Sequence, residues 1–70
     1  MKDEWNSRLE NGRDVDYSKE PDSEEPGPES WWRITAQARD SDILHTDSTN
    51  GPISKQEVET RFREDLMKER

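Results

Sequence analysis

The sequence predicts an α+β fold in which a small strand-strand-helix (ββα) unit follows an acidic, largely disordered N-terminal segment. Three observations support this prediction. Polar and apolar residues alternate from residue 31 onward, a helix-capping pattern precedes an apolar stripe near the C-terminus, and carboxylates and prolines crowd the stretch before residue 31. We therefore expect a short helix within residues 1–12, an acidic proline-rich linker over 13–30 and a small ββα domain over 31–70.

The composition places the chain near the limit at which a small protein can fold. Only 24% of its 70 residues are hydrophobic and 41% are charged, so little apolar surface is available to offset the conformational entropy lost on folding. The formal net charge is −7, and most of the acidic excess lies in residues 1–30, which hold ten acidic and four basic side chains. Such a charge repels nucleic acid and anionic membranes and attracts basic protein surfaces.

Several kinds of chemistry lack the residues that they need. The chain has no cysteine, which removes disulfides, thiolate metal sites and cysteine nucleophiles. No stretch approaches the roughly 18 apolar residues of a membrane span, and the first residues lack the apolar core of a signal peptide. We therefore expect a cytoplasmic protein that is not an enzyme and that holds no cofactor and no metal ion.

The spacing of Trp5 and Leu9 predicts a short helix over residues 3–10. Residues four apart share one face of a helix, and the Gly12 that follows is typical of a helix stop. Isolated helices shorter than about 12 residues are marginal in water. This helix therefore needs a surface on which Trp5 and Leu9 can dock.

The stretch over residues 13–30 has the composition of a linker. It begins with a weak strand signal, in which Val15 and Tyr17 alternate with charged residues, but the signal is too short to define a strand. From residue 18 to residue 30 the chain offers no apolar side chain apart from prolines. Repulsion among its carboxylates favours an extended, solvated chain.

Residues 31–46 predict a β-hairpin. Apolar residues occupy the even positions from Trp32 to Ala38 and polar residues the odd ones, which is the period of a half-buried strand. Turn-forming residues follow at 40–42, so residues 43–46 return as a second, short strand. The polar residues after this strand are dense in turn formers and predict a loop.

The strongest local signal predicts a helix over residues 55–69. Ser54 and Glu57 have the spacing of a capping box, in which the serine side chain accepts a hydrogen bond from the amide of the third helical residue. Ile53 and Val58 occupy the positions of a hydrophobic staple around the same helix start. Two independent signals therefore agree on where the helix begins.

The helix stripe and the hairpin define the expected core. Val58, Phe62 and Leu66 recur every four residues and are expected to face Trp32 and Ile34 of the first strand. Burying apolar surface contributes about 25 cal/mol per Å². For so few side chains, this contribution is smaller than the conformational entropy cost of ordering about 40 residues. The ββα unit therefore needs more cover, from the N-terminal segment folding back, from a second copy in a homodimer or from a partner protein.

The Trp31-Trp32 pair lies at the start of the expected domain. Neighbouring residues of a strand point to opposite faces, so Trp32 belongs to the core while Trp31 shares the other face with Arg33 and Arg39. Trp and Arg are enriched among the residues that dominate binding energy at protein interfaces. We expect Trp31 either to be covered by the N-terminal segment or to serve as an exposed anchor for a partner.

His45 is the sole histidine, and its serine and aspartate neighbours resemble parts of a catalytic triad or of a calcium loop. A triad needs fixed geometry in a desolvated pocket, which a short strand and polar loops do not provide. A calcium loop that starts at Asp40 needs a glycine where His45 stands. We therefore expect His45 to be an ordinary strand or surface residue.

Together these features predict a small acidic protein-binding module that inhibits or modulates a basic, nucleic-acid-binding partner protein, in the manner of a DNA mimic. Its acidic surface is expected from the first 30 residues and from the helix. The candidate partner-binding residues are Trp31, Arg33, Arg39, Glu24, Glu25, Glu29, Asp40 and Asp42. The alternative is a minor structural subunit or assembly factor of a larger complex, which would use Trp5, Leu9, Trp31 and the hairpin edge.

Overall fold

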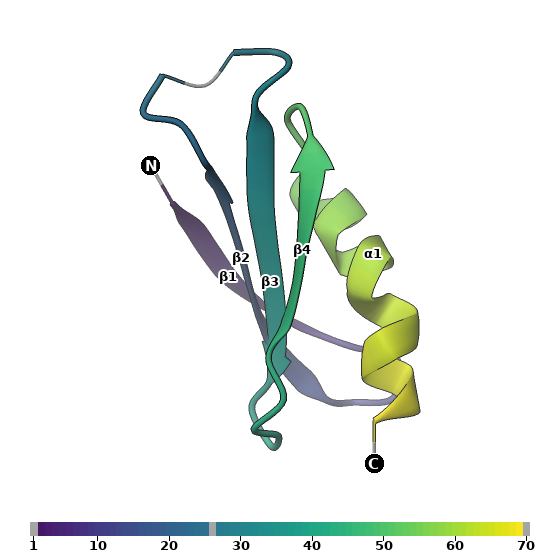
Figure 1. The fold of residues 1–70 in the computed structure, drawn as a ribbon. Coiled ribbons are helices and arrows are strands. Elements are labelled where there is room, and N and C mark those ends of the chain that lie inside the picture. Colours follow the sequence, from purple (N-terminus) through teal and green to yellow (C-terminus); the bar gives the residue numbers. More distant parts are fainter. Residues whose placement is uncertain (1, 26, 70) are drawn as a thin grey trace.

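The protein is built on one antiparallel sheet of four strands with a helix on one of its faces (Figure 1). The computed structural model describes residues 2–25 and 27–69. The elements along the chain are β1 (Asp3–Arg8), β2 (Asp14–Pro21), β3 (Trp31–Ala38), β4 (His45–Asn50) and α1 (Lys55–Lys68). Each strand pairs with the next one along the chain, and α1 packs mainly on β2 and β3.

The prediction of a disordered N-terminal segment with a helix over residues 3–10 is wrong, because this part of the chain supplies two of the four strands. β1 places Trp5 opposite Tyr17 of β2, and β2 in turn pairs with β3. The spacing that suggested a helix also suits a strand, since Trp5 and Leu9 share one face of either structure. Gly12, with φ of +91°, belongs to the turn between β1 and β2 and stops no helix.

The prediction of a solvated linker over residues 13–30 is wrong for residues 14–21, which form β2, whereas residues 22–25 and 27–30 lie in the loop between β2 and β3. Val15 and Tyr17 point toward α1 from β2 and are 0% and 3% exposed. Lys19 lies on the same face, and its Nζ donates a hydrogen bond to the Ile53 carbonyl oxygen at 2.7 Å, so the end of this long side chain is satisfied at the margin of the core. The short alternation in the sequence is therefore part of a real strand.

The loop between β2 and β3 is held against the end of β4. The Gly51 amide donates a hydrogen bond to the Ser30 carbonyl at 2.7 Å, and the Asn50 side chain donates one to the Glu29 carbonyl at 2.8 Å. Gly51 has φ of +85°, and a Cβ there would lie 3.0 Å from the Pro28 carbonyl oxygen, so both the backbone angle and the close approach favour glycine.

The hairpin over residues 31–46 is longer than predicted. The connection between β3 and β4 covers residues 39–44, and it leaves Ile43 and Leu44 52% and 56% exposed. The polar residues 47–50, for which the sequence predicted a loop, belong to β4. They suit this position because β4 is an edge strand whose side chains are mostly exposed to solvent.

Helix α1 begins at Lys55, where the capping pattern predicts it. The Ser54 hydroxyl oxygen accepts a hydrogen bond from the Glu57 amide at 3.2 Å, and Ile53 and Val58 are both buried beside this turn. Within residues 2–25 and 27–69, no helix has both the length and the apolar character needed to cross a membrane.

Charged side chains on both sides of α1 reach the sheet. An Arg61 Nη1 atom lies 2.7 Å from Asp47 of β4, and Arg63 pairs with Glu10 at the end of β1. On the β1 side, Trp5 Nε1 also donates a hydrogen bond to Glu59 at 3.1 Å. Polar contacts therefore join both sides of the helix to the sheet.

The core draws on the whole chain. Its buried apolar side chains are Val15, Tyr17, Ile34, Ala36, Ala38, Ile53, Val58, Phe62 and Leu66. Trp5 and Leu9 pack against this cluster. Of the three sources of additional cover that the sequence suggested, the N-terminal segment provides it, but as strands and not as a helix.

Tyr17 belongs to a cluster of aromatic and charged side chains at the β1 side of the core. Its ring stacks on that of Trp5 with the centroids 5.5 Å apart and the planes at 18°. The Lys55 ammonium lies 5.5 Å from the Trp5 ring centroid, a favourable cation–π geometry. Burial, with a smaller contribution from the negative charge of Glu59, raises the pKa of Tyr17 from 10.0 to about 12.

Truncating Val15 tests whether the N-terminal segment belongs to the core. We expect Val15→Ala to lower the free energy of unfolding by about 2 kcal/mol, since it removes two methyl groups from a fully buried site. Urea unfolding measures the change. In the matched control, Met67→Ala removes more atoms from a side chain that is 40% exposed and should change the free energy by no more than about 0.5 kcal/mol. Equally small effects of both substitutions would contradict the assignment of β2.

The ionisation of Tyr17 tests its burial directly, because it is the sole tyrosine. Its folded-state pKa lies above its ordinary value, so the folded protein holds this proton more tightly than the unfolded chain. The resulting stability is complete below pH 10 and is lost as the pH rises toward 12. A titration of tyrosinate absorbance should give a midpoint near 12 for the folded protein and near 10 in urea. A folded-state midpoint near 10 would contradict the packing, and Tyr17→Phe should remove the transition.

Candidate functional site

The sheet has one face beneath α1 and one face over which no element of the described residues lies. We call the second the open face. Strand alternation and the pairing registers assign to it Glu4, Asn6, Arg8, Asp14, Asp16, Ser18, Glu20, Trp31, Arg33, Thr35, Gln37, Thr46, Ser48 and Asn50. These side chains are polar or charged except for Trp31, which is therefore a candidate binding residue.

The arginines on the open face lie next to carboxylates of neighbouring strands. Arg8 lies 3.3 Å from Asp14 between β1 and β2, and Arg33 lies 3.5 Å from Asp22 just beyond β2. Arg39, directly after β3, reaches back to Asp16 at 3.3 Å. Exposed pairs of this kind add little stability. They do lower the repulsion among the carboxylates on this face.

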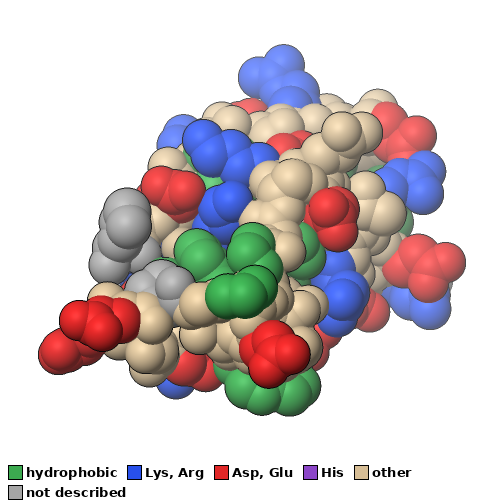
Figure 2. Space-filling view, turned by 90° about the horizontal axis from the view of Figure 1, so that it is seen from above, with side chains coloured by type: hydrophobic (Ala, Val, Ile, Leu, Met, Phe, Trp, Pro, Cys, Tyr) green, Lys and Arg blue, Asp and Glu red, His purple; other side chains and the backbone are tan. Residues whose placement is uncertain are grey.

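The acidic surplus gathers at one end of the open face, around Trp31. We call Trp31 together with Glu20, Asp22, Glu24, Glu25 and Glu29 the acidic end. The Trp31 side chain is 54% exposed, and its carbonyl oxygen accepts a hydrogen bond from the Asp22 amide at 2.9 Å, which fixes the start of the acidic loop beside the ring. Figure 2 looks onto this end of the molecule and shows hydrophobic side chains with carboxylates and Lys or Arg side chains around them.

The two tryptophans point to opposite faces as predicted, but Trp32 is only half-buried and does not belong to the buried core in which the sequence placed it. Trp32 lies on the helix side of β3 with Ile34, and the Lys19 ammonium lies 5.9 Å from its ring centroid. Its indole Nε1 is buried and has no hydrogen-bond partner among the described residues. Trp31 points to the open face and is exposed, because the N-terminal segment forms β1 at the far edge of the sheet and does not cover it.

The predicted partner-binding residues fall into two groups. Five lie at or beside the acidic end, namely Trp31, Arg33, Glu24, Glu25 and Glu29. The other three, Arg39, Asp40 and Asp42, lie at the opposite end of β3, roughly 20–25 Å away at about 3.3 Å per strand residue. The expected acidic contribution of the helix is absent, because α1 carries four basic and four acidic side chains.

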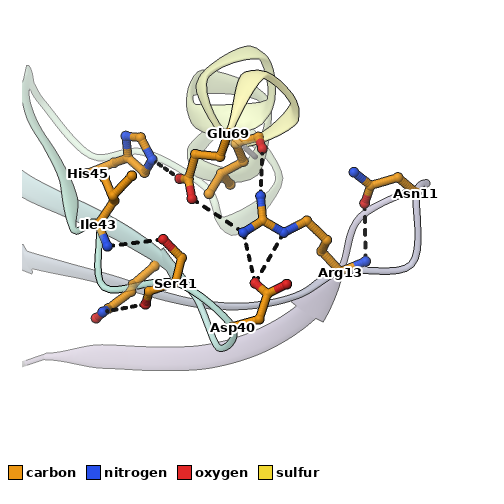
Figure 3. A network of polar contacts seen from close by, with 9 residues as sticks. Asn11, Arg13, Asp40, Ser41, Ile43, His45 and Glu69 are labelled. Carbon is orange, nitrogen blue, oxygen red and sulfur yellow. Dashed lines mark hydrogen bonds and ion pairs between the residues drawn. The ribbon is translucent and has the colours of Figure 1, made fainter.

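A second polar cluster closes the opposite end of the molecule (Figure 3). Arg13 donates hydrogen bonds to Asp40 at 2.8 Å, to Glu69 at 3.3 Å and to the Leu66 carbonyl at 2.9 Å. His45 Nε2 is hydrogen-bonded to the Glu69 carboxylate. We call Arg13, Asp40, His45 and Glu69 the clasp, because they join the last turn of α1 to the sheet.

The clasp holds Glu69 in its charged form. The Glu69 side chain is only 6% exposed, and burial alone would raise the pKa of its carboxyl group. Hydrogen bonds from His45, Ser41 and Arg13 outweigh burial and hold the pKa of Glu69 below its ordinary value of 4.5. A hydrogen bond from Arg13 likewise lowers the pKa of Asp40.

The order of groups in the clasp differs from that of a catalytic triad. The base of a triad must contact the nucleophile, whereas the Glu69 carboxylate lies between Ser41 and His45. We therefore interpret the clasp as structural. No local pattern in the sequence indicates the clasp, because Arg13 and Glu69 are 56 positions apart.

The part of the chain that the structure describes offers neither a metal site nor an enclosed pocket. Among residues 2–25 and 27–69, no group of three or more His, Cys, Asp or Glu side chains could hold a metal ion. A shallow depression beside β4 is lined by Arg33, Thr46, Asp47 and Ser48, and it is too open to enclose a small ligand. The acidic end therefore remains the candidate binding surface.

Comparisons with known proteins give no relative for this chain, since no protein family matches it and neither a curated protein nor a solved structure is detectably similar.

The pH dependence of stability tests the clasp. Because the pKa of Glu69 is lowered in the folded state, its contribution to stability is present above pH 4.5 and is lost as the pH falls below that value. We expect Glu69→Gln to reduce the loss of stability in acid, as measured by urea unfolding at a series of pH values. The control Glu64→Gln changes an exposed carboxylate of α1 and should keep the wild-type pH dependence. Identical pH profiles for both variants would show that Glu69 is not held in its charged form.

Proposed function

We propose that this protein is a small acidic binding module whose acidic end binds a basic, nucleic-acid-binding protein and modulates or inhibits it. One observation carries the proposal. A tryptophan that is 54% exposed lies beside the densest group of carboxylates in the chain.

The chemistry of the acidic end suits a basic partner. Carboxylates around an apolar ring attract Lys and Arg side chains electrostatically and offer a flat surface against which their alkyl stems and cations can pack. Long-range attraction of this kind speeds association with a positively charged protein. Competition with nucleic acid for the same basic surface would make the module an inhibitor.

The alternative of a structural subunit or assembly factor loses two of its expected contact residues. Trp5 and Leu9 pack against the chain's own core, so a larger complex would have to use Trp31 and the sheet edges. The acidic end therefore supports the binding-module proposal more directly than the alternative.

Paired charge variants test the proposal. Capture on the immobilised protein with elution by rising salt identifies basic candidates, and the deciding measurements use a purified candidate. We expect Glu24→Gln/Glu25→Gln to weaken binding by about tenfold or more, and Trp31→Ala to weaken it by a similar factor. Raising the salt from about 50 to 500 mM should weaken the wild-type complex steeply.

The matched control is Glu64→Gln/Asp65→Asn, which removes the same formal charge from exposed positions of α1. It should leave affinity nearly unchanged if the acidic end is the binding surface. Equal effects of the two double variants would show that affinity depends only on the net charge of the chain and not on the acidic end. Affinity that is indifferent to salt would overturn the electrostatic proposal, and a failure to displace nucleic acid from the partner would overturn the inhibitory role.

A further inference from the structure

The two edge strands of the sheet are protected to different degrees. β1 carries Asp3, Glu4 and Arg8, and charges on an edge strand oppose pairing with another chain. β4 has the sequence His-Thr-Asp-Ser-Thr-Asn. Its one carboxylate, Asp47, pairs with Arg61 of α1 at 2.7 Å. The β4 edge is therefore the less protected of the two.

The outer side of β4 is also open in space. Helix α1 packs mainly on β2 and β3, and most β4 side chains are exposed. The shallow depression described above follows the middle of this strand, over Thr46 to Ser48. Directly before β4, Ile43 and Leu44 are 52% and 56% exposed. An unpaired backbone edge thus lies next to exposed apolar side chains.

We propose that β4 pairs antiparallel with β4 of a second copy of this chain, with the two-fold axis at Thr46, to give a continuous eight-stranded sheet. The proposal is independent of the binding function above, because the pairing uses neither Trp31 nor the acidic loop between β2 and β3.

Charge favours a second copy at this edge in spite of the overall net charge of −7. The acidic surplus lies at the acidic end, whereas the middle of β4 has Arg33 and Arg61 around a single carboxylate, Asp47. The row of open-face residues that leads to the axis, Ser18, Thr35 and Thr46, is uncharged. Self-association through β4 therefore avoids most of the repulsion between two acidic chains.

The register follows from strand geometry. A two-fold axis perpendicular to the sheet keeps the two helices on the same face, so residues opposite each other must have equal parity, and the axis passes through residue 46, 47 or 48. An axis at Asp47 would set two carboxylates against each other. An axis at Ser48 would leave Ile43 and Leu44 unpaired.

An axis at Thr46 avoids opposing the two carboxylates and also gives Ile43 and Leu44 a partner strand. It places His45 opposite Asp47 of the second copy, and it brings Ile43 and Leu44 alongside Thr49 and Ser48 of that copy. The exposed apolar side chains are then partly covered, and the one carboxylate of each strand faces an imidazole. Among the three registers this one buries the most apolar surface without opposing like charges.

The natural absence of cysteine allows a direct test. In the 70-residue chain, Thr46→Cys places two thiols opposite each other at the axis, at the separation that a disulfide requires. We expect it to form a covalent dimer under mild oxidation about tenfold faster than Thr60→Cys, an exposed helix position, because pairing raises the effective concentration of the thiols. Ser48→Cys should behave like Thr60→Cys, and faster oxidation of Ser48→Cys than of Thr46→Cys would overturn the register.

Sedimentation of the unmodified chain and of charge variants provides the second measurement. The mass should rise with concentration from 8.3 kDa toward twice that value. Thr46→Lys opposes two ammonium groups at the axis and should keep the protein monomeric, while Thr60→Lys, the same chemical change on α1, should still dimerise. A wild-type chain that stays at 8.3 kDa at every soluble concentration, or a dimer that survives Thr46→Lys, would overturn the proposal.

Discussion

The fold depends on the position of β2 between β1 and β3, with Val15 and Tyr17 beneath α1. Without β2, β1 would have no partner strand, and the apolar stripe of α1 would cover only part of β3. Tyr17 in turn gives Trp5 a ring on which to stack, 5.5 Å away. A chain that is only 24% hydrophobic folds because nine of its apolar residues are 6% exposed or less and form one core between the sheet and the helix.

Signals that depend only on neighbouring residues predicted the structure well. The start of α1 follows from Ser54 and its capping partner, and the opposite orientations of Trp31 and Trp32 follow from strand alternation alone. The prediction failed where pairing with a distant segment decides the outcome. Trp5 and Leu9 share a face in a helix and in a strand, so their spacing cannot distinguish the two, and only the adjacent β2 selects the strand.

The candidate site, like the fold, could be predicted only where its residues lie close together along the chain. The sequence located Trp31 and the carboxylates of the acidic loop that precedes it, because these lie close together along the chain. It could not show that Arg39, Asp40 and Asp42 lie at the other end of β3, since this follows from the length of that strand. Nor could it show the clasp, which unites Arg13 with a carboxylate 56 positions away.

The distribution of charge concentrates the acidic surplus of the chain on the surface that we propose for binding. Helix α1 is electrically balanced, and the carboxylates of the clasp are held by Arg13 and its neighbours. On the open face, arginines from adjacent strands offset some of the carboxylates. Neutralisation elsewhere leaves the surplus concentrated at the acidic end, where Arg33 pairs with Asp22. The proposed partner would therefore meet negative charge and the Trp31 ring together, and the proposed pairing at β4 would use an edge with little net charge.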